Sequence, residues 1–163
     1  MRLIPLILAV GLVACAPVPD MKEYAYPAWG FAISFRGDPK VTDTPAAADG
    51  SNRHALLVQL NLAGRDNLIN VIDGTGSTKS EDQALDDAPA VLAKAAGGTM
   101  GPLTYAASGQ AKGREFLLNK PGRQPARVRI FVWKQHLYEL ISESSLGPDD
   151  PETKAFLDSF RLL

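Results

Sequence analysis

A segment that could bind phosphate runs from Asp73 to Ser80 and reads Asp-Gly-Thr-Gly-Ser-Thr-Lys-Ser. A phosphate-binding loop of this kind needs a glycine directly before the Lys-Ser pair and a second glycine five positions earlier. Position 78 is threonine, so the spacing fails. We interpret the segment as a turn whose hydroxyl groups cap the helix that follows it.

The chain has two histidines, His54 and His136, and the second opens a sequence that resembles a zinc motif. His136-Leu137-Tyr138-Glu139-Leu140 begins like H-x-x-E-H, but Leu140 stands where the second histidine would be. The two histidines share no ligand spacing. We therefore predict no metal site, with His54 at the end of an apolar strand face and His136 on an exposed turn.

Residues for acid–base or nucleophilic catalysis form no recognisable pattern. The chain lacks a G-x-S-x-G sequence, and its paired acids, Asp86-Asp87 and Asp149-Asp150, stand near expected helix starts, where negative charge is favourable. We predict no catalytic residue, no cofactor and no enzymatic activity. An enzyme without a recognisable motif is the second alternative, and it would require distant ionisable groups to converge in a cleft.

The remaining reactive residue is Cys15, the single cysteine of the chain. It follows one positive charge, Arg2, and an apolar run of 12 residues from Leu3 to Ala14, which is the order of an export signal. A membrane-spanning helix needs about 20 residues, so the run is too short to span. Leu12-Val13-Ala14-Cys15 resembles the lipobox of bacterial lipoproteins. The resemblance implies cleavage between Ala14 and Cys15 and a lipid, such as palmitate, on the cysteine sulfur.

These features divide the chain into a signal peptide (1–14), a lipidated N-terminus and tether (15–28) and one globular domain (29–163). A single cysteine allows no internal disulfide. Many Gram-negative lipoproteins that stay at the inner membrane have Asp after the cysteine, whereas this chain has Ala16. We therefore expect the protein in the cell envelope, at the outer membrane and facing the periplasm.

Charge gives no sign of a nucleic-acid partner. The whole chain has 17 Lys and Arg residues against 18 Asp and Glu residues. Because Arg2 lies in the signal segment, the mature chain keeps 16 of those basic residues and has no basic excess.

Strand-like alternation appears in several segments of the domain. The sequence predicts strands at 30–35, 54–62, 68–73, 103–108, 113–118, 126–133 and 137–144, most of them joined as hairpins. The stretch from 40 to 51 has no periodicity and is predicted to be a loop. The pattern leaves the register of the last hairpin open.

Two segments have helical periodicity. Between Ser80 and Ala96, apolar residues recur at helical spacing, and either Thr78 with Glu81 or Ser80 with Gln83 fits a capping box. Pro89 implies either a kink or a start near Asp87. The second helix is expected within 148–160, with Asp150 as N-cap and Pro151 as the first helical residue. The fold class predicted is α+β, with two helices packed on a mainly antiparallel sheet of about six or seven strands.

The last hairpin contains a cluster of aromatic and basic residues. Aromatic and arginine side chains are enriched where proteins bind one another. We expect a contact face for a protein or ligand here, formed by Arg127, Arg129, Phe131, Trp133, His136 and Tyr138.

Both ends of the domain resemble a known family. Gly30–Val41 resembles the G-F-x-I-x-F-P-x-x-P-x-V opening of PsbP-like and DcrB-like domains, although Arg36 replaces the usual proline. Ala155–Leu162 is similar to their terminal helix, which often reads F-L-x-S-F. The resemblance implies an αβα sandwich without catalytic residues, because the family is largely non-enzymatic.

The sequence thus predicts a membrane-anchored envelope lipoprotein with a non-catalytic interaction domain, acting with an envelope protein in assembly, maintenance or stress response. The first alternative is a periplasmic carrier of a small or lipidic ligand. It predicts a cavity between sheet and helix, lined by residues such as Leu56, Val58, Val128 and Ile130.

Overall fold

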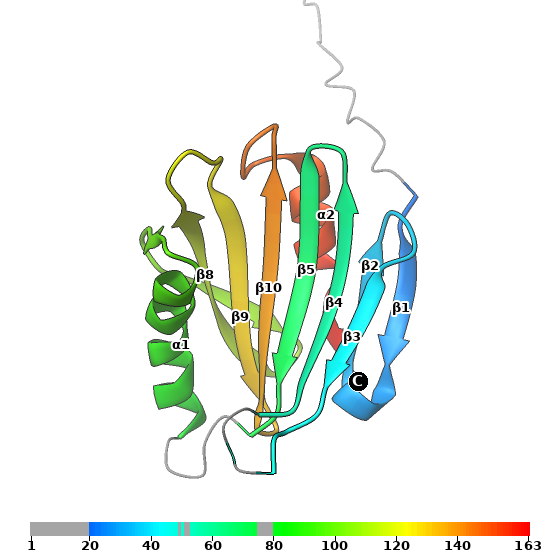
Figure 1. The fold of residues 1–163 in the computed structure, drawn as a ribbon, viewed down its shortest axis with the longest axis vertical. Coiled ribbons are helices and arrows are strands. Elements are labelled where there is room, and N and C mark those ends of the chain that lie inside the picture. Colours follow the sequence, from blue (N-terminus) through cyan, green and yellow to red (C-terminus); the bar gives the residue numbers. More distant parts are fainter. Residues whose placement is uncertain (1–19, 49, 51–52, 75–79) are drawn as a thin grey trace, which may run out of the picture.

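The computed structural model describes residues 20–48, 50, 53–74 and 80–163. These form two antiparallel sheets and two helices (Figure 1). The main sheet contains, in spatial order, β3 (Lys40–Thr44), β4 (Ala55–Leu62), β5 (Arg65–Ile72), β10 (His136–Ser144), β9 (Ala126–Trp133), β8 (Ala111–Asn119) and β6 (Thr99–Met100). An eighth strand, β7 (Thr104–Ser108), also pairs with β8.

The second sheet, called the small sheet below, contains β1 (Lys22–Tyr26), β2 (Phe31–Phe35) and β11 (Arg161–Leu162). A short 3-10 turn, η1 (Pro27–Trp29), lies between β1 and β2. Helix α1 (Glu81–Ala95) lies along β8 and β9, whereas α2 (Pro151–Asp158) lies behind β10 and β5 in Figure 1. No helix in the described part of the chain is long and apolar enough to cross a membrane.

Two-residue turns set the register of the central hairpins. Lys134 and Gln135, which join β9 to β10, both have positive φ (48° and 68°). Such turns match the right-handed twist of the flanking strands. The turn places Trp133 opposite His136 and Phe131 opposite Tyr138, which is the register that the sequence left open.

The core is divided in two by the main sheet. One face of the sheet packs against the small sheet and α2 through residues such as Val58, Phe131 and Tyr138. The other face packs against α1 through residues such as Val128 and Ile130. Because neighbouring residues of a strand point to opposite faces, β9 and β10 contribute to both halves of the core.

The expected α+β class, the antiparallel sheet and the two helices are confirmed. The main sheet is larger than the six or seven strands expected, because β6 and β3 are edge strands with every residue exposed and show no buried face in the sequence. The prediction of a loop at 40–51 is therefore wrong for Lys40–Thr44.

The expected tether, 15–28, is also too long, because it includes β1 and part of η1. Strand β1 is the edge of the small sheet, and only Tyr24 and Tyr26 pack partly against the core. The sequence signal for this strand was the pair of tyrosines at the strand period of two. The neighbouring prolines are typical of a linker, and they favoured the tether instead.

Both helix starts follow the predicted capping chemistry. Ser80 and Gln83 form a capping box at α1, whereas Thr78 lies outside the described residues. The helix runs through Pro89, so a start near Asp87 is wrong. Asp150 caps α2 by accepting a hydrogen bond from the Glu152 N–H, and Pro151 is its first residue.

Candidate functional site

The expected contact face is divided by the fold. Phe131 and Tyr138 are each 1% exposed and lie in the core, where Phe131 stacks on Phe160. Trp133 and His136 are half-buried. The prediction of a contact face is therefore wrong for Phe131 and Tyr138, because the small sheet and α2 cover the face of β9 that sequence alternation had assigned to solvent.

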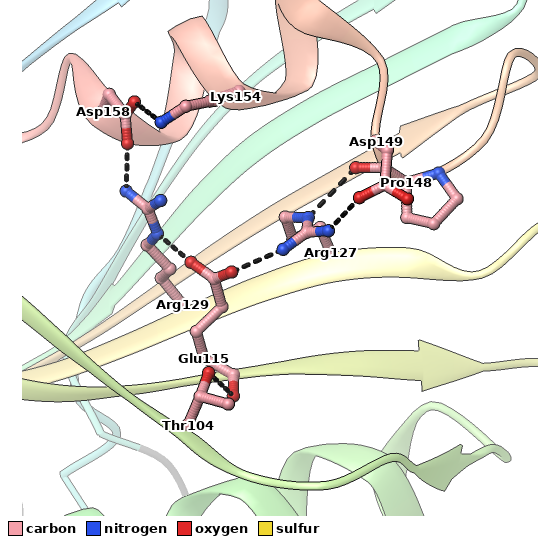
Figure 2. Close-up of polar contacts among 8 residues, drawn as sticks. All are labelled: Thr104, Glu115, Arg127, Arg129, Pro148, Asp149, Lys154 and Asp158. Atoms are coloured by element: carbon pink, nitrogen blue, oxygen red, sulfur yellow. Dashed lines mark hydrogen bonds and ion pairs between the residues drawn. The ribbon is translucent and has the colours of Figure 1, made fainter.

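The arginines of that face lie instead in a polar cluster with Glu115, drawn in Figure 2. Arg127 Nη1 donates to Glu115 Oε1 at 2.5 Å, and Arg129 Nε donates to the other oxygen of the same carboxylate. Arg127 also donates to Asp149 and, at 3.0 Å, to the Pro148 carbonyl. The cluster thus joins β8 and β9 to the loop before α2.

The cluster extends to the C-terminal end of α2. Arg129 Nη1 donates to Asp158 Oδ1 at 2.7 Å, and Lys154 Nζ donates to the other oxygen of Asp158 at 2.5 Å (Figure 2). Both ends of α2 are therefore connected to the sheet through two arginines that share one carboxylate.

Charge in the cluster is balanced. Three cationic side chains face three carboxylates. All of them except Asp158 line a pocket of 220 Å³. Burial raises the pKa of Glu115, but hydrogen bonds from Arg129 and Arg127 outweigh it and hold that pKa below its ordinary value. Glu115 is thus a charged acceptor held by two guanidinium groups. Because its proton affinity is lowered, it is poorly suited to donate a proton, and the cluster fixes α2 in place.

A second ionic group holds the start of α2. Asp150 is buried at 6% exposure, accepts a hydrogen bond from Ser144 Oγ at 2.6 Å and pairs with Arg65. Arg65 also pairs with Glu152 at 2.9 Å. Burial raises the pKa of Asp150, but its hydrogen bonds and the Arg65 charge lower it below the ordinary value.

The two histidines, far apart in sequence, both contact Trp29. Ring centroids are 4.6 Å apart for His54 and Trp29 and 5.9 Å apart for His136 and Trp29. His54 also lies 2.7 Å from Asp43, and His136 lies 3.7 Å from Asp73. Nothing in the sequence signalled this meeting, which depends on η1 of the small sheet reaching the main sheet. No group of three or more metal-ligating residues occurs in the described ranges.

The other motifs resolve into structure where they are described. In the glycine-rich segment, Asp73, Gly74 and Ser80 are described, whereas residues 75–79 lie outside the described part of the chain. His136 and Glu139 belong to strand β10, where their odd spacing places them on opposite faces of the sheet. Ala14 and Cys15, the expected cleavage and lipidation positions, also lie outside the described residues.

Tyr138 is expected to make the protein sensitive to alkali. Its hydroxyl donates to the Trp29 carbonyl at 3.0 Å, and burial raises the pKa of Tyr138 to about 12. Because the folded pKa exceeds the unfolded value of 10.0, this contribution to stability is complete below pH 10 and is lost as pH rises toward 12. The free energy of unfolding should fall by up to about 1.4 kcal/mol per pH unit in that window. Denaturant unfolding at several pH values measures it, and the fall should be shallower in Tyr138→Phe. Equal slopes in the two proteins would contradict the assignment.

Comparison with known proteins gives a structural likeness. No protein-family model matches the chain, and no curated protein matches it. The chain is similar to the solution structure of cyanobacterial PsbP (CyanoP) from Synechocystis sp. PCC 6803, with a TM-score of 0.59 and 7% sequence identity. The likeness covers 94% of this chain and 99% of that chain. The fold is PsbP-like.

In this PsbP-like domain the cavity expected for a ligand carrier is not where the sequence placed it. Leu56 and Val58 are 3% and 0% exposed and pack toward the small sheet, whereas Val128 and Ile130 pack toward α1. The two pairs lie on opposite faces of the main sheet, so they cannot line one cavity. The prediction is wrong because alternation in the sequence does not show on which side of the sheet the apolar residues of separate strands lie.

In the described part of the chain, neither helix packs closely over one region of the PsbP-like sheet. Helix α1 covers β8 and β9, but beyond them the same face of β10, β5 and β4 has half-buried apolar side chains. Glu139 lies among them at 7% exposure, and Asn70 Nδ2 donates to its Oε2 at 2.8 Å. Burial raises the pKa of Glu139, which the hydrogen bond from Asn70 only partly offsets.

Proposed function

We propose that this protein is a bacterial envelope lipoprotein, anchored to a membrane by a lipid on Cys15, whose domain binds other proteins and catalyses no reaction. The observation that carries the anchor is Leu12-Val13-Ala14-Cys15 directly after a short apolar run. A cysteine is required there because the lipid is transferred to sulfur. Ala16 after the cysteine favours the outer membrane, with the domain in the periplasm.

The start of the fold is compatible with such an anchor. Strand β1 begins at Lys22, seven residues after Cys15, and seven residues span at most about 25 Å. Strand β1 starts at the end of the domain that also has the β4–β5 turn and the loop before α2, the upper end in Figure 1. A lipid on Cys15 would hold this end toward the bilayer. The part of the main sheet beyond α1 would then be accessible to other proteins.

Two observations support an interaction role over catalysis. The ionisable side chains around α2 are joined to one another as ion pairs that fix the helix. The domain also resembles the PsbP-like family, which we expect to be largely non-enzymatic. The part in assembly, maintenance or stress response follows from the envelope location alone.

The anchor is tested by comparing the full chain with Cys15→Ser in a bacterial host. We expect the unaltered protein in the membrane fraction, resistant to high salt and released by detergent. Mass spectrometry of its N-terminal peptide should show a diacylglycerol or triacyl addition at Cys15. Because serine cannot accept the lipid, the variant should lose that addition and leave the membrane fraction or keep its signal peptide.

A lipid-free protein cleaved elsewhere and found in the soluble fraction would contradict the anchor. Asp20→Asn, which lies between Cys15 and β1, is the matched control and should behave like the unaltered chain. Separation of inner and outer membranes by density then tests the expectation from Ala16.

A further inference from the structure

The helix-free part of the main sheet has a defined composition. Tyr138 and Leu140 of β10 point into the core toward the small sheet, so their neighbours in β10 point to the opposite side. The register places Glu139 beside Asn70 and Asn70 beside Leu57, in one row across β10, β5 and β4. We define the uncovered face as Glu139 and Asn70 with the half-buried apolar residues Leu57, Leu68 and Ile72. Leu137 and Ile141 form its border, where they pack against the half of the core under α1.

Among the described residues, no cation pairs with the carboxylate at the centre of this face. Two carboxylates are buried among the described residues, Glu139 and Asp150. Asp150 has Arg65, Ser144 and a backbone N–H as partners, whereas Glu139 has the Asn70 amide. One amide hydrogen bond compensates a buried negative charge only in part, which agrees with the raised pKa of Glu139.

We propose that the uncovered face is a docking surface for a partner protein that presents a lysine or arginine flanked by apolar side chains. This inference deepens the proposed interaction role and rests on it. A cation placed over Glu139 would supply the missing charge, and the surrounding leucine and isoleucine side chains would exclude water from the pair. A carboxylate beneath a rim of apolar groups is complementary to such a partner in both charge and hydrophobicity.

A second copy of this chain fits the face less well. A two-fold dimer through this surface would place the same patch of both copies together. Glu139 of one copy would then approach Glu139 of the other, and like charges in a dry interface oppose association. Charge complementarity therefore favours a different, basic partner.

The test uses a photo-crosslinking amino acid in place of Leu68, in the full chain in its own host. The comparison site is Tyr105 on β7, which is 85% exposed and lies outside the uncovered face. We expect a crosslinked partner from position 68, with a lysine or arginine among apolar residues in the crosslinked peptide. Its yield should fall about 30-fold or more in Glu139→Gln, as the affinity does for other buried charge pairs that lose one partner.

Two variants keep a folding defect from being mistaken for lost binding. Glutamine at 139 retains an oxygen that can accept from Asn70, so Glu139→Gln should unfold at a denaturant concentration no lower than that of the unaltered protein. Leu57→Lys introduces a like charge facing the partner at a half-buried position. It should also abolish the crosslink, provided that its circular dichroism spectrum is unchanged.

The outcomes separate this inference from the interaction role itself. Crosslinks from position 105 with none from position 68 would overturn the docking surface and leave the interaction role standing. A yield unchanged by Glu139→Gln, a crosslinked peptide without a basic residue, or crosslinking to a second copy would overturn it as well. Absence of crosslinks from both positions would count against the interaction role and the docking surface together.

Discussion

Replacing Asp150 with alanine is expected to lower the free energy of unfolding by about 3 kcal/mol. The change removes the N-cap of α2, which contributes about 1 kcal/mol in typical helices. It also leaves Arg65 with Glu152 alone and Ser144 without its acceptor, and breaking a buried ion pair is a further large loss. Chemical denaturation at pH 7 measures the difference.

The neighbouring acid provides the control for Asp150. Asp149 also pairs with an arginine, but its side chain is 88% exposed, so Asp149→Ala should cost less than about 1 kcal/mol. Asp150→Asn keeps a capping oxygen and removes the charge, and we expect an intermediate loss. Equal losses in Asp149→Ala and Asp150→Ala would contradict the buried role.

The effect of Asp150 has a defined pH dependence. Because the folded pKa lies below the unfolded value of 3.8, the stability that the carboxylate contributes is present above that value. It is lost as the pH falls further, through the folded pKa. The difference between Asp150→Ala and the unaltered protein should therefore shrink in acid.

Replacing Phe131 with alanine should lower the free energy of unfolding by about 3 to 5 kcal/mol, the usual range for a buried phenylalanine. Phe131 is 1% exposed and stacks on Phe160 with ring centroids 5.1 Å apart. The truncation would leave a cavity between the main sheet and the small sheet. The loss appears as a lower melting temperature and a lower denaturation midpoint.

An exposed aromatic residue separates this core role from a surface role. Tyr105 is 85% exposed and lies under the guanidinium of Arg114, 4.9 Å from its ring centroid. Tyr105→Ala should change stability by no more than about 1 kcal/mol. If Phe131→Ala were as stable as the unaltered protein, the core role of Phe131 would be contradicted. The contact face that the sequence predicted at this residue would then be supported.

The sequence alone determined features that depend on neighbours along the chain. The cap at Asp150 and the strand Ala126–Trp133 follow from local hydrogen bonding and from alternation, and the structure confirms both. Of the two capping boxes that the sequence allowed at the first helix, the structure has the one formed by Ser80 and Gln83. The lipidation expected at Cys15 rests on sequence as well and stays a prediction. Edge strand β3 escaped detection because an edge strand exposed along its whole length leaves no apolar pattern.

Only the tertiary structure decided which faces are covered. Alternation in β9 distinguished its two sides but could not show that both are buried, because the second cover comes from β1, β2 and α2 at the ends of the chain. The same packing brings His54 and His136 to Trp29. It also places Glu139 on β10, beyond the strands that α1 mainly covers in the described part of the chain. Burial and charge pairing are set by contacts between distant segments, which a local pattern does not record.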